Sequence, residues 1–172
     1  NSLDQSLVRL LSLRDDGGNT PLLYAAFKGH LKMFIKLIEL GVDYTEKNNA
    51  GLNSILMAAQ GDNPNIIVYL KEKFNVDLFE DVDDLNNDAL HWACASGSKQ
   101  TLDFLLFYIN EKYNNLDVIN RVDRQGQTAL HVTILTTGST STIKKLIKKG
   151  IDLTIRDKNG LTAFDLVREN AK

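Results

Sequence analysis

The sequence is poor in cysteine, proline and long apolar runs, and each scarcity excludes a class of protein. Cys94 is the single cysteine among 172 residues, so no internal disulfide can form. None of the sixteen asparagines lies in an Asn-x-Ser/Thr sequon, which argues against the secretory pathway. The longest wholly apolar stretch, 104–109, is far shorter than the roughly 20 residues of a membrane span. We therefore expect a cytoplasmic chain that does not itself cross a membrane.

An excess of one charge is also missing. The 20 Lys and Arg residues against 22 Asp and Glu residues give a formal net charge of −2, so no surplus is available to bind a phosphate backbone. We expect no nucleic-acid partner. One basic set, Lys144, Lys145, Lys148 and Lys149, is a candidate for anionic lipid or an acidic partner, but such sets are more often the solvated face of a helix.

The chain opens with Asn1 rather than Met and has no signal-peptide pattern, so we interpret it as a piece of a longer protein. Its composition, 43% apolar and 24% charged, is ordinary for a globular chain and excludes disorder as the main description.

What the sequence does contain is an internal repeat. A short polar residue of the kind that caps a helix N-terminus recurs at intervals of 33, 35, 40 and 34 residues. These caps are Thr20, Asn53, Asp88, Thr128 and Thr162. Two residues before each cap stands a type that tolerates positive φ, namely Gly18, Gly51, Asn86, Gly126 and Gly160. Five residues before each cap stands a side chain that can bond turn backbone: Asp15, Asn48, Asp83, Asp123 and Asp157.

Each cap is followed by two helical patterns. Apolar and small residues at the second, fifth and sixth positions after the cap, as in 22–26, predict a short helix that a second helix can approach closely. The spacing i, i+3, i+4, i+7 in 102–109 is typical of that second helix. Gly41, Asn75 and Gly150 are expected to end second helices with positive φ.

Several short phrases carry a family resemblance. They are Thr20-Pro21-Leu22 with Ala25-Ala26, Ala89-Leu90-His91-Trp92-Ala93, Thr128-Ala129-Leu130-His131 and Asp157-Lys158-Asn159-Gly160-Leu161-Thr162-Ala163. They resemble ankyrin repeats, and the strength of the resemblance lies in five registered copies that cover nearly the whole chain. It implies an all-α ankyrin-repeat solenoid of stacked helix-turn-helix units, with about five repeats and partial terminal units.

The same register divides the chain into units of one domain, 1–172. We predict part of a preceding repeat at 1–13, repeats at 14–46, 47–81, 82–121 and 122–155, and a half repeat at 156–172. The 40-residue step leaves about seven extra residues, which we place within 108–120 as an extended second helix or a longer loop.

Catalytic and metal-binding motifs are missing, so no catalytic, cofactor or metal residue is predicted. His91 and Cys94 stand three residues apart and could superficially be half a zinc site or a thiolate–imidazole pair. The resemblance implies instead that His91 and His131 bond loop backbone between repeats and that Cys94 is core. The acidic residues within 80–88 lack the spacing of a calcium loop and are expected to form a solvated turn.

In ankyrin proteins the turns and first helices form a concave groove that binds partners, so the resemblance implies where such a site lies. Tyr24, Phe27, Met57 and Trp92 would give this groove an apolar, aromatic-rich column. Trp92 is equally compatible with a packing role. The predicted partner-binding residues are Tyr24, Phe27, Met57, Gln60, Trp92, Ser96, Asn87, Arg124 and Gln127.

These observations favour a non-catalytic protein–protein interaction module, expected to be a monomer, that binds a peptide or protein partner in its groove. An alternative is the substrate-recruiting ankyrin domain of a membrane-bound protein S-palmitoyltransferase, on the cytosolic face of the membrane. The stretch 58–93 resembles the ankyrin region of Asp-His-His-Cys palmitoyltransferases. An enzyme within these residues would need clustered titratable groups, whereas His30, His91 and His131 stand in separate units.

Overall fold

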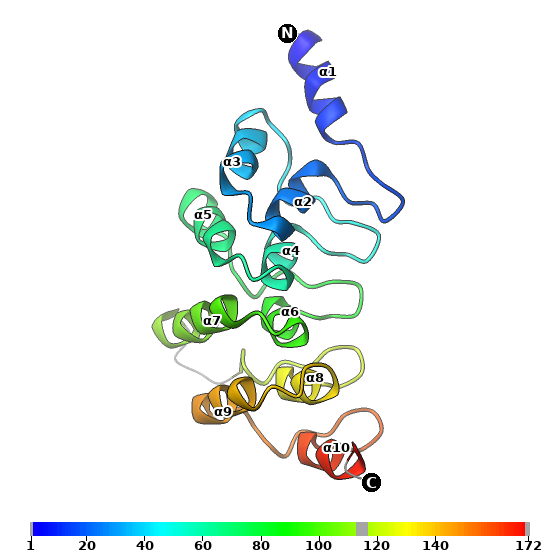
Figure 1. Cartoon of the computed structure of the whole chain (residues 1–172), viewed down its shortest axis with the longest axis vertical. Helices are drawn as coiled ribbons and strands as arrows, with labels where there is room; N and C mark the ends of the chain where they lie inside the picture. The colour runs from blue at the N-terminus through cyan, green and yellow to red at the C-terminus, as the bar shows by residue number, and fades with distance from the viewer. Residues whose placement is uncertain (1, 113–116, 171–172) are drawn as a thin grey trace.

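The computed structural model describes residues 2–112 and 117–170. Within these ranges the helices form two columns, which Figure 1 shows one beside the other. The inner column consists of α2 (Pro21–Lys28), α4 (Ser54–Gln60), α6 (Ala89–Ser96), α8 (Ala129–Leu135) and α10 (Ala163–Asn170). The outer column consists of α3 (Leu31–Glu39), α5 (Pro64–Phe74), α7 (Lys99–Lys112) and α9 (Thr140–Lys149). One further helix, α1 (Ser2–Leu11), lies at the N-terminal end of the stack.

Each inner helix packs against the inner helix of the next unit, from α2 on α4 to α8 on α10. The loops between units project to the other side of the inner column (Figure 1). In the described residues the only strand-like pairing is an isolated bridge between Arg156 and Thr162. The prediction of an all-α ankyrin-repeat solenoid is therefore confirmed.

The predicted caps begin the inner helices. The side chains of Asn53 and Asp88 each accept two backbone N–H groups of the first helical turn, at 3.0–3.1 Å. Thr20 accepts the N–H of Leu23 at 3.3 Å, and Thr162 accepts that of Asp165 at 3.2 Å. These bonds satisfy N–H groups that the helix itself leaves without a partner.

The projecting loops, which we call fingers (14–19, 47–52, 82–87, 122–127 and 156–161), share one turn. In all five copies the residue three positions before the inner helix has positive φ, from 66° at Asn86 to 81° at Gly51, as predicted. A backbone hydrogen bond joins each finger to the next: Asn49 N–H to Gly17 O, Asp84 N–H to Ala50 O, Arg124 N–H to Leu85 O and Lys158 N–H to Gln125 O, at 2.8–3.2 Å. The fingers therefore form a continuous row along one side of the stack.

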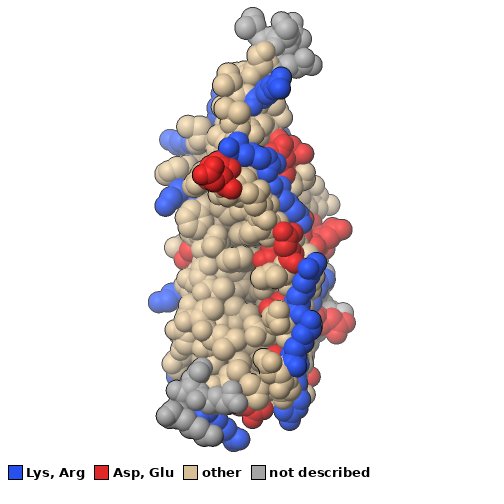
Figure 2. Space-filling view, turned by 90° about the vertical axis from the view of Figure 1, so that its right-hand side faces the viewer, with Lys and Arg blue, Asp and Glu red and all other residues tan. Residues whose placement is uncertain are grey.

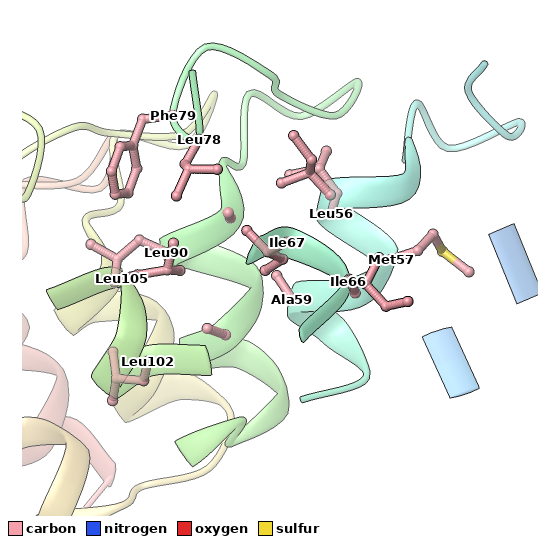
Figure 3. Packing of buried hydrophobic residues seen from close by; sticks show 14 of the residues in the cluster. Leu56, Met57, Ala59, Ile66, Ile67, Leu78, Phe79, Leu90, Leu102 and Leu105 are labelled. Carbon is pink, nitrogen blue, oxygen red and sulfur yellow. The ribbon is translucent and has the colours of Figure 1, made fainter. Parts of the chain in front are cut away.

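The core runs between the two columns as one cluster of buried side chains. Figure 3 shows part of it, with Ile66 and Ile67 from α5, Leu90 from α6 and Leu105 from α7. Leu78 and Phe79, from the loop that follows α5, are fully buried in the same cluster. Burying each such side chain stabilises the fold by about 1.5–3 kcal/mol.

The long step between the third and fourth caps contains an extended second helix. α7 has 14 residues and ends at Lys112, whereas α3, α5 and α9 have 9, 11 and 10. The part of this prediction that falls on Asn114 and Asn115 lies outside the described residues.

Candidate functional site

The fingers and inner helices of the first three units enclose a hollow of about 310 Å³, which we call the first hollow. Its floor is apolar, with Tyr24 and Phe27 from α2, Met57 from α4 and Trp92 from α6. Its remaining lining residues are Asn19, Asn48, Ala50, Leu52 and Gln60. Since none of these nine residues is charged, the first hollow suits an apolar or uncharged polar group. Figure 2 shows this finger side of the molecule, where a broad area without Lys, Arg, Asp or Glu lies beside a band of charged side chains.

Two of the aromatic residues are fixed by hydrogen bonds to the turn of their own finger. Tyr24 Oη donates to Asp15 Oδ2 at 2.7 Å, and Trp92 Nε1 donates to Asp83 Oδ2 at 3.1 Å. The bond from Tyr24 lowers the pKa of Asp15 below its ordinary value, and the same bond raises the pKa of Tyr24. Both rings are therefore positioned before any partner arrives, which reduces the entropy lost on binding.

A second hollow, of about 190 Å³, lies between the third and fourth units. Trp92 lines it too, together with Ala95 and Val132 from the inner helices. Its polar lining consists of Asn87, His91, Asp123 and Gln127. Trp92 therefore belongs to both hollows, and together they form one groove along the first four units.

The structure places seven of the nine predicted partner-binding residues in this groove. The first hollow contains Tyr24, Phe27, Met57, Gln60 and Trp92, and the second contains Trp92, Asn87 and Gln127. Met57 is only 6% exposed, so it forms floor rather than a projecting anchor, while Tyr24 is 46% exposed. Ser96 and Arg124 are exposed but line neither hollow.

Sequence reasoning did not single out the aspartates that bind the two aromatic rings. Asp15 and Asp83 had been assigned to the turn alone, a role they also play through Oδ1. The available signal was the coincidence, in the first and third units only, of this aspartate with an aromatic hydrogen-bond donor nine residues later.

His91 and His131 link successive units, as the resemblance implied. His91 Nε2 lies 3.1 Å from Gln127 O, and His131 Nε2 lies 3.2 Å from Leu161 O. On its other side, His91 Nδ1 lies 2.8 Å from Asp88 Oδ1. A carboxylate and a carbonyl oxygen both only accept, so the protonated ring of His91 can donate to both.

The Asp88–His91 pair is buried, with His91 2% exposed. Burial by itself lowers the pKa of His91, but the charge of Asp88 and the hydrogen bonds outweigh it, so that the pKa lies above its ordinary value. Burial likewise raises the pKa of Asp88, and the charge and hydrogen bonds of His91 outweigh it and lower that pKa. These interactions give the pair a structural role, because both polar atoms of the ring are already bonded.

Cys94 lies in the core, as expected, and burial raises the pKa of its thiol to about 12. A thiol in that state is not a nucleophile at neutral pH. Among residues 2–112 and 117–170, no three His, Cys, Asp or Glu side chains come together as a metal-binding group. The groove therefore offers apolar and polar surfaces for binding.

A larger hollow of about 730 Å³ lies elsewhere, against α3. Its lining residues all come from α3 and the turn before it, within 29–36, so it is an open flank of one helix. The groove, in contrast, is assembled from four units.

Comparison with known families agrees with this geometry. A family model described as ankyrin repeats (3 copies) matches residues 42–117, and the single ankyrin repeat model matches residues 17–49 and 125–158. The unit boundaries given above are finer than these matches and stay a prediction.

Three relatives are similar over most of this chain. The Danio rerio protein named "Putative palmitoyltransferase ZDHHC13" is 29% identical over 160 residues, which cover 91% of this chain and 23% of that protein. The transient receptor potential cation channel subfamily A member 1 homolog of Caenorhabditis elegans is 26% identical, over 94% of this chain and 15% of its own length. Palmitoyltransferase AKR1 of Lachancea kluyveri is 25% identical, over 95% of this chain and 22% of its own. The chain thus spans less than a quarter of each relative.

Among the described residues, none of the helices is both long enough and apolar enough to cross a bilayer.

Proposed function

The chain belongs to the ankyrin repeat family, and on that premise we propose that it binds a peptide or protein segment in the groove formed by the two hollows. Ankyrin repeats are protein-interaction modules and do no catalysis of their own. One observation carries the choice of site: Trp92, whose ring is tied to Asp83, lies at the junction of both hollows. Tryptophan and tyrosine are the residues that most often dominate interface energies.

The binding is proposed to be apolar at its centre. Tyr24, Phe27 and Trp92 offer ring surface, and the side-chain amide of Gln60 lies beside it as a hydrogen-bond partner for a backbone. An extended segment lying along the groove would cross several units in succession. We further propose that the chain acts in the cytoplasm, as a monomer.

Replacing Trp92 tests the proposal. We expect Trp92→Ala to lower the recovery of specifically bound proteins from a cell extract at least tenfold, because it removes the ring that both hollows share. The measurement is quantitative mass spectrometry of proteins retained by the immobilised wild-type and variant chains. Circular dichroism and thermal unfolding establish that the variant is folded, since Trp92 also packs partly against the core.

Phe107→Ala provides the matched control. Phe107 is an aromatic residue that is 63% exposed on the outer helix α7, so its removal exposes no new core and leaves the groove intact. Recovery should be unchanged for this variant. Equal recovery by the wild type and a folded Trp92→Ala chain would contradict the proposed site.

Two of the relatives suggest a second candidate function, because their names describe palmitoyltransferases. We propose as the alternative that this chain is the substrate-recruiting part of a membrane-bound protein S-palmitoyltransferase, with the acyl-transfer chemistry in another part of that protein. The sequence of the complete reading frame tests this alternative. It should encode several apolar membrane spans and an Asp-His-His-Cys tetrapeptide outside the present chain, and a reading frame without them would reject the alternative.

A further inference from the structure

Asp123 differs from the equivalent aspartates of the other fingers. In each finger one oxygen of this side chain closes the turn: Asp123 Oδ1 accepts the N–H groups of Gln125 and Gln127 at 2.7 and 2.8 Å. In the first and third fingers the other oxygen accepts from the rings of Tyr24 and Trp92 and from the amides of Asn19 and Asn87, and in the last finger it accepts from Asn159 Nδ2 at 3.4 Å. In the fourth unit the residue at the position of these rings is Val132, which has no donor.

As a result, Asp123 Oδ2 has no hydrogen-bond donor within the described residues. Asp123 is half-buried and lines the second hollow. A carboxylate oxygen in such a place retains its full capacity to accept a hydrogen bond from a partner.

Two charged residues line the second hollow, Asp123 and His91. His91 is the positive group that lines the second hollow, and its charge is already paired with Asp88. Arg121 bonds the carbonyl of Phe79, and neither Arg121 nor Arg124 lines the hollow. The charge of Asp123 also acts on His91, but no Lys or Arg is among the residues that line the hollow.

The remaining walls fit an alkyl chain. Trp92, Ala95 and Val132 give an aromatic face and two small apolar surfaces next to the carboxylate. A Lys or Arg side chain buries its methylene groups on such surfaces while its charged end reaches an anion, and a cation also interacts favourably with the face of Trp.

We infer that the groove recognises a segment with an apolar side chain for the first hollow and a basic side chain, Lys or Arg, for the second, where Asp123 binds it. The inference rests on the proposed function and adds the partner's charge. The centres of the two hollows lie one to two inner-helix spacings of about 8–10 Å apart, and an extended chain of about 3.3 Å per residue covers that distance in roughly three to six residues.

The chain itself supplies the variant that removes the charge and keeps the turn. Asn48 occupies the position of Asp123 in the second finger, and its Oδ1 accepts the N–H groups of Ala50 and Leu52 at 3.0 and 2.9 Å. Asp123→Asn is therefore expected to preserve the finger. Asp157→Asn is the matched control, since Asp157 closes the last finger in the same way but lines neither hollow.

The test is selection of a random 12-residue peptide library displayed on phage against the immobilised wild type, Trp92→Ala, Asp123→Asn and Asp157→Asn chains. Peptides selected by the wild type and lost with Trp92→Ala should be enriched in Lys or Arg at a fixed distance from an apolar residue. That enrichment should vanish for Asp123→Asn and persist for Asp157→Asn.

Synthetic peptides then measure the pairing directly. Changing the enriched basic residue to Gln should weaken binding to the wild type at least fivefold and leave binding to Asp123→Asn nearly unchanged, the pattern of a coupled pair. Trp92-dependent peptides without a basic residue, or with one that Asp123→Asn still selects, would overturn this inference and leave the proposed function standing. If no selected peptide depends on Trp92, the proposed function fails and the inference fails with it.

Discussion

At the scale of single residues, His91 and His131 occupy the same position of successive units but make different hydrogen bonds. His91 faces two acceptors, the carboxylate of Asp88 and the carbonyl of Gln127. His131 Nδ1 instead accepts the N–H of Thr128 at 3.3 Å and lies 2.9 Å from Thr128 Oγ1. Both histidines keep the inter-unit contact of Nε2, and the change of cap from Thr to Asp replaces the contact of Nδ1 with Thr128 by a buried contact with a carboxylate.

This pair makes stability depend on pH. Because the pKa of His91 is raised on folding, its contribution is fully present below the unfolded pKa of about 6.5 and is lost as the pH rises through the folded value. The pKa of Asp88 is lowered, so its contribution is lost only in acid, as the pH falls through that lower value. We expect the wild type to lose more unfolding free energy than His91→Gln between pH 6 and pH 9, as measured by urea denaturation. Parallel losses in the two proteins would contradict the ion pair.

Predictability at this scale was uneven. The histidines that bridge repeats and the buried Cys94 follow from the resemblance to ankyrin repeats, which assigns these roles to positions at fixed distances from the cap. The bonds from Tyr24 to Asp15 and from Trp92 to Asp83 could not be predicted as readily, since they require the finger to fold back over the inner helix. The Asp123 oxygen that has no donor among the described residues is harder still to predict, because it depends on what a different element, α8, lacks at Val132.

At the scale of elements, the contact between neighbouring units depends on a glycine at the end of α4. Gly61 has an ordinary φ of −84°, so conformation does not require a glycine there. Space does: a Cβ at this position would lie 2.0 Å from the carbonyl oxygen of Phe27 in the preceding unit. Asn63 Nδ2 donates to the same oxygen at 2.7 Å, which fixes the approach.

We therefore expect Gly61→Ala to destabilise the stack by about 1–3 kcal/mol, the usual cost of overpacking against atoms that cannot move. Gly17→Ala is the control, because its Cβ would meet side-chain atoms and no backbone: Asn19 Nδ2 at 2.9 Å and Asp15 Oδ1 at 3.4 Å. Urea denaturation of both variants gives the comparison. Similar free energies of unfolding for the two would show that the units do not approach as closely as described.

The elements were also the part best predicted from sequence. All five caps immediately precede an inner helix, and all five turn positions have positive φ, because these local requirements restrict residue type strongly. The long third interval was less informative. Asparagine-rich sequence is compatible with helix end or loop, and packing of the apolar face of 102–109 extends α7 to Lys112.

At the scale of the whole molecule, the groove is a product of stacking. No unit contains either hollow alone: the first uses residues of three units and the second uses residues of two. Repetition predicts that such a surface exists and which positions face it, because the same offsets recur in every unit. Repetition does not predict the depth or the charge of the groove, because these depend on the residues that differ between units.

The central claim is that a partner polypeptide lies in this groove, and site-specific photo-crosslinking tests it most directly. The photoreactive residue p-benzoylphenylalanine would replace Phe27, in the floor of the first hollow, or Phe107, exposed on the outer helix α7. Irradiation in a cell extract should yield discrete cross-linked polypeptides from position 27, abolished by the additional change Trp92→Ala, and none of these from position 107. The same cross-linked polypeptides from position 107, or none from position 27, would contradict the claim.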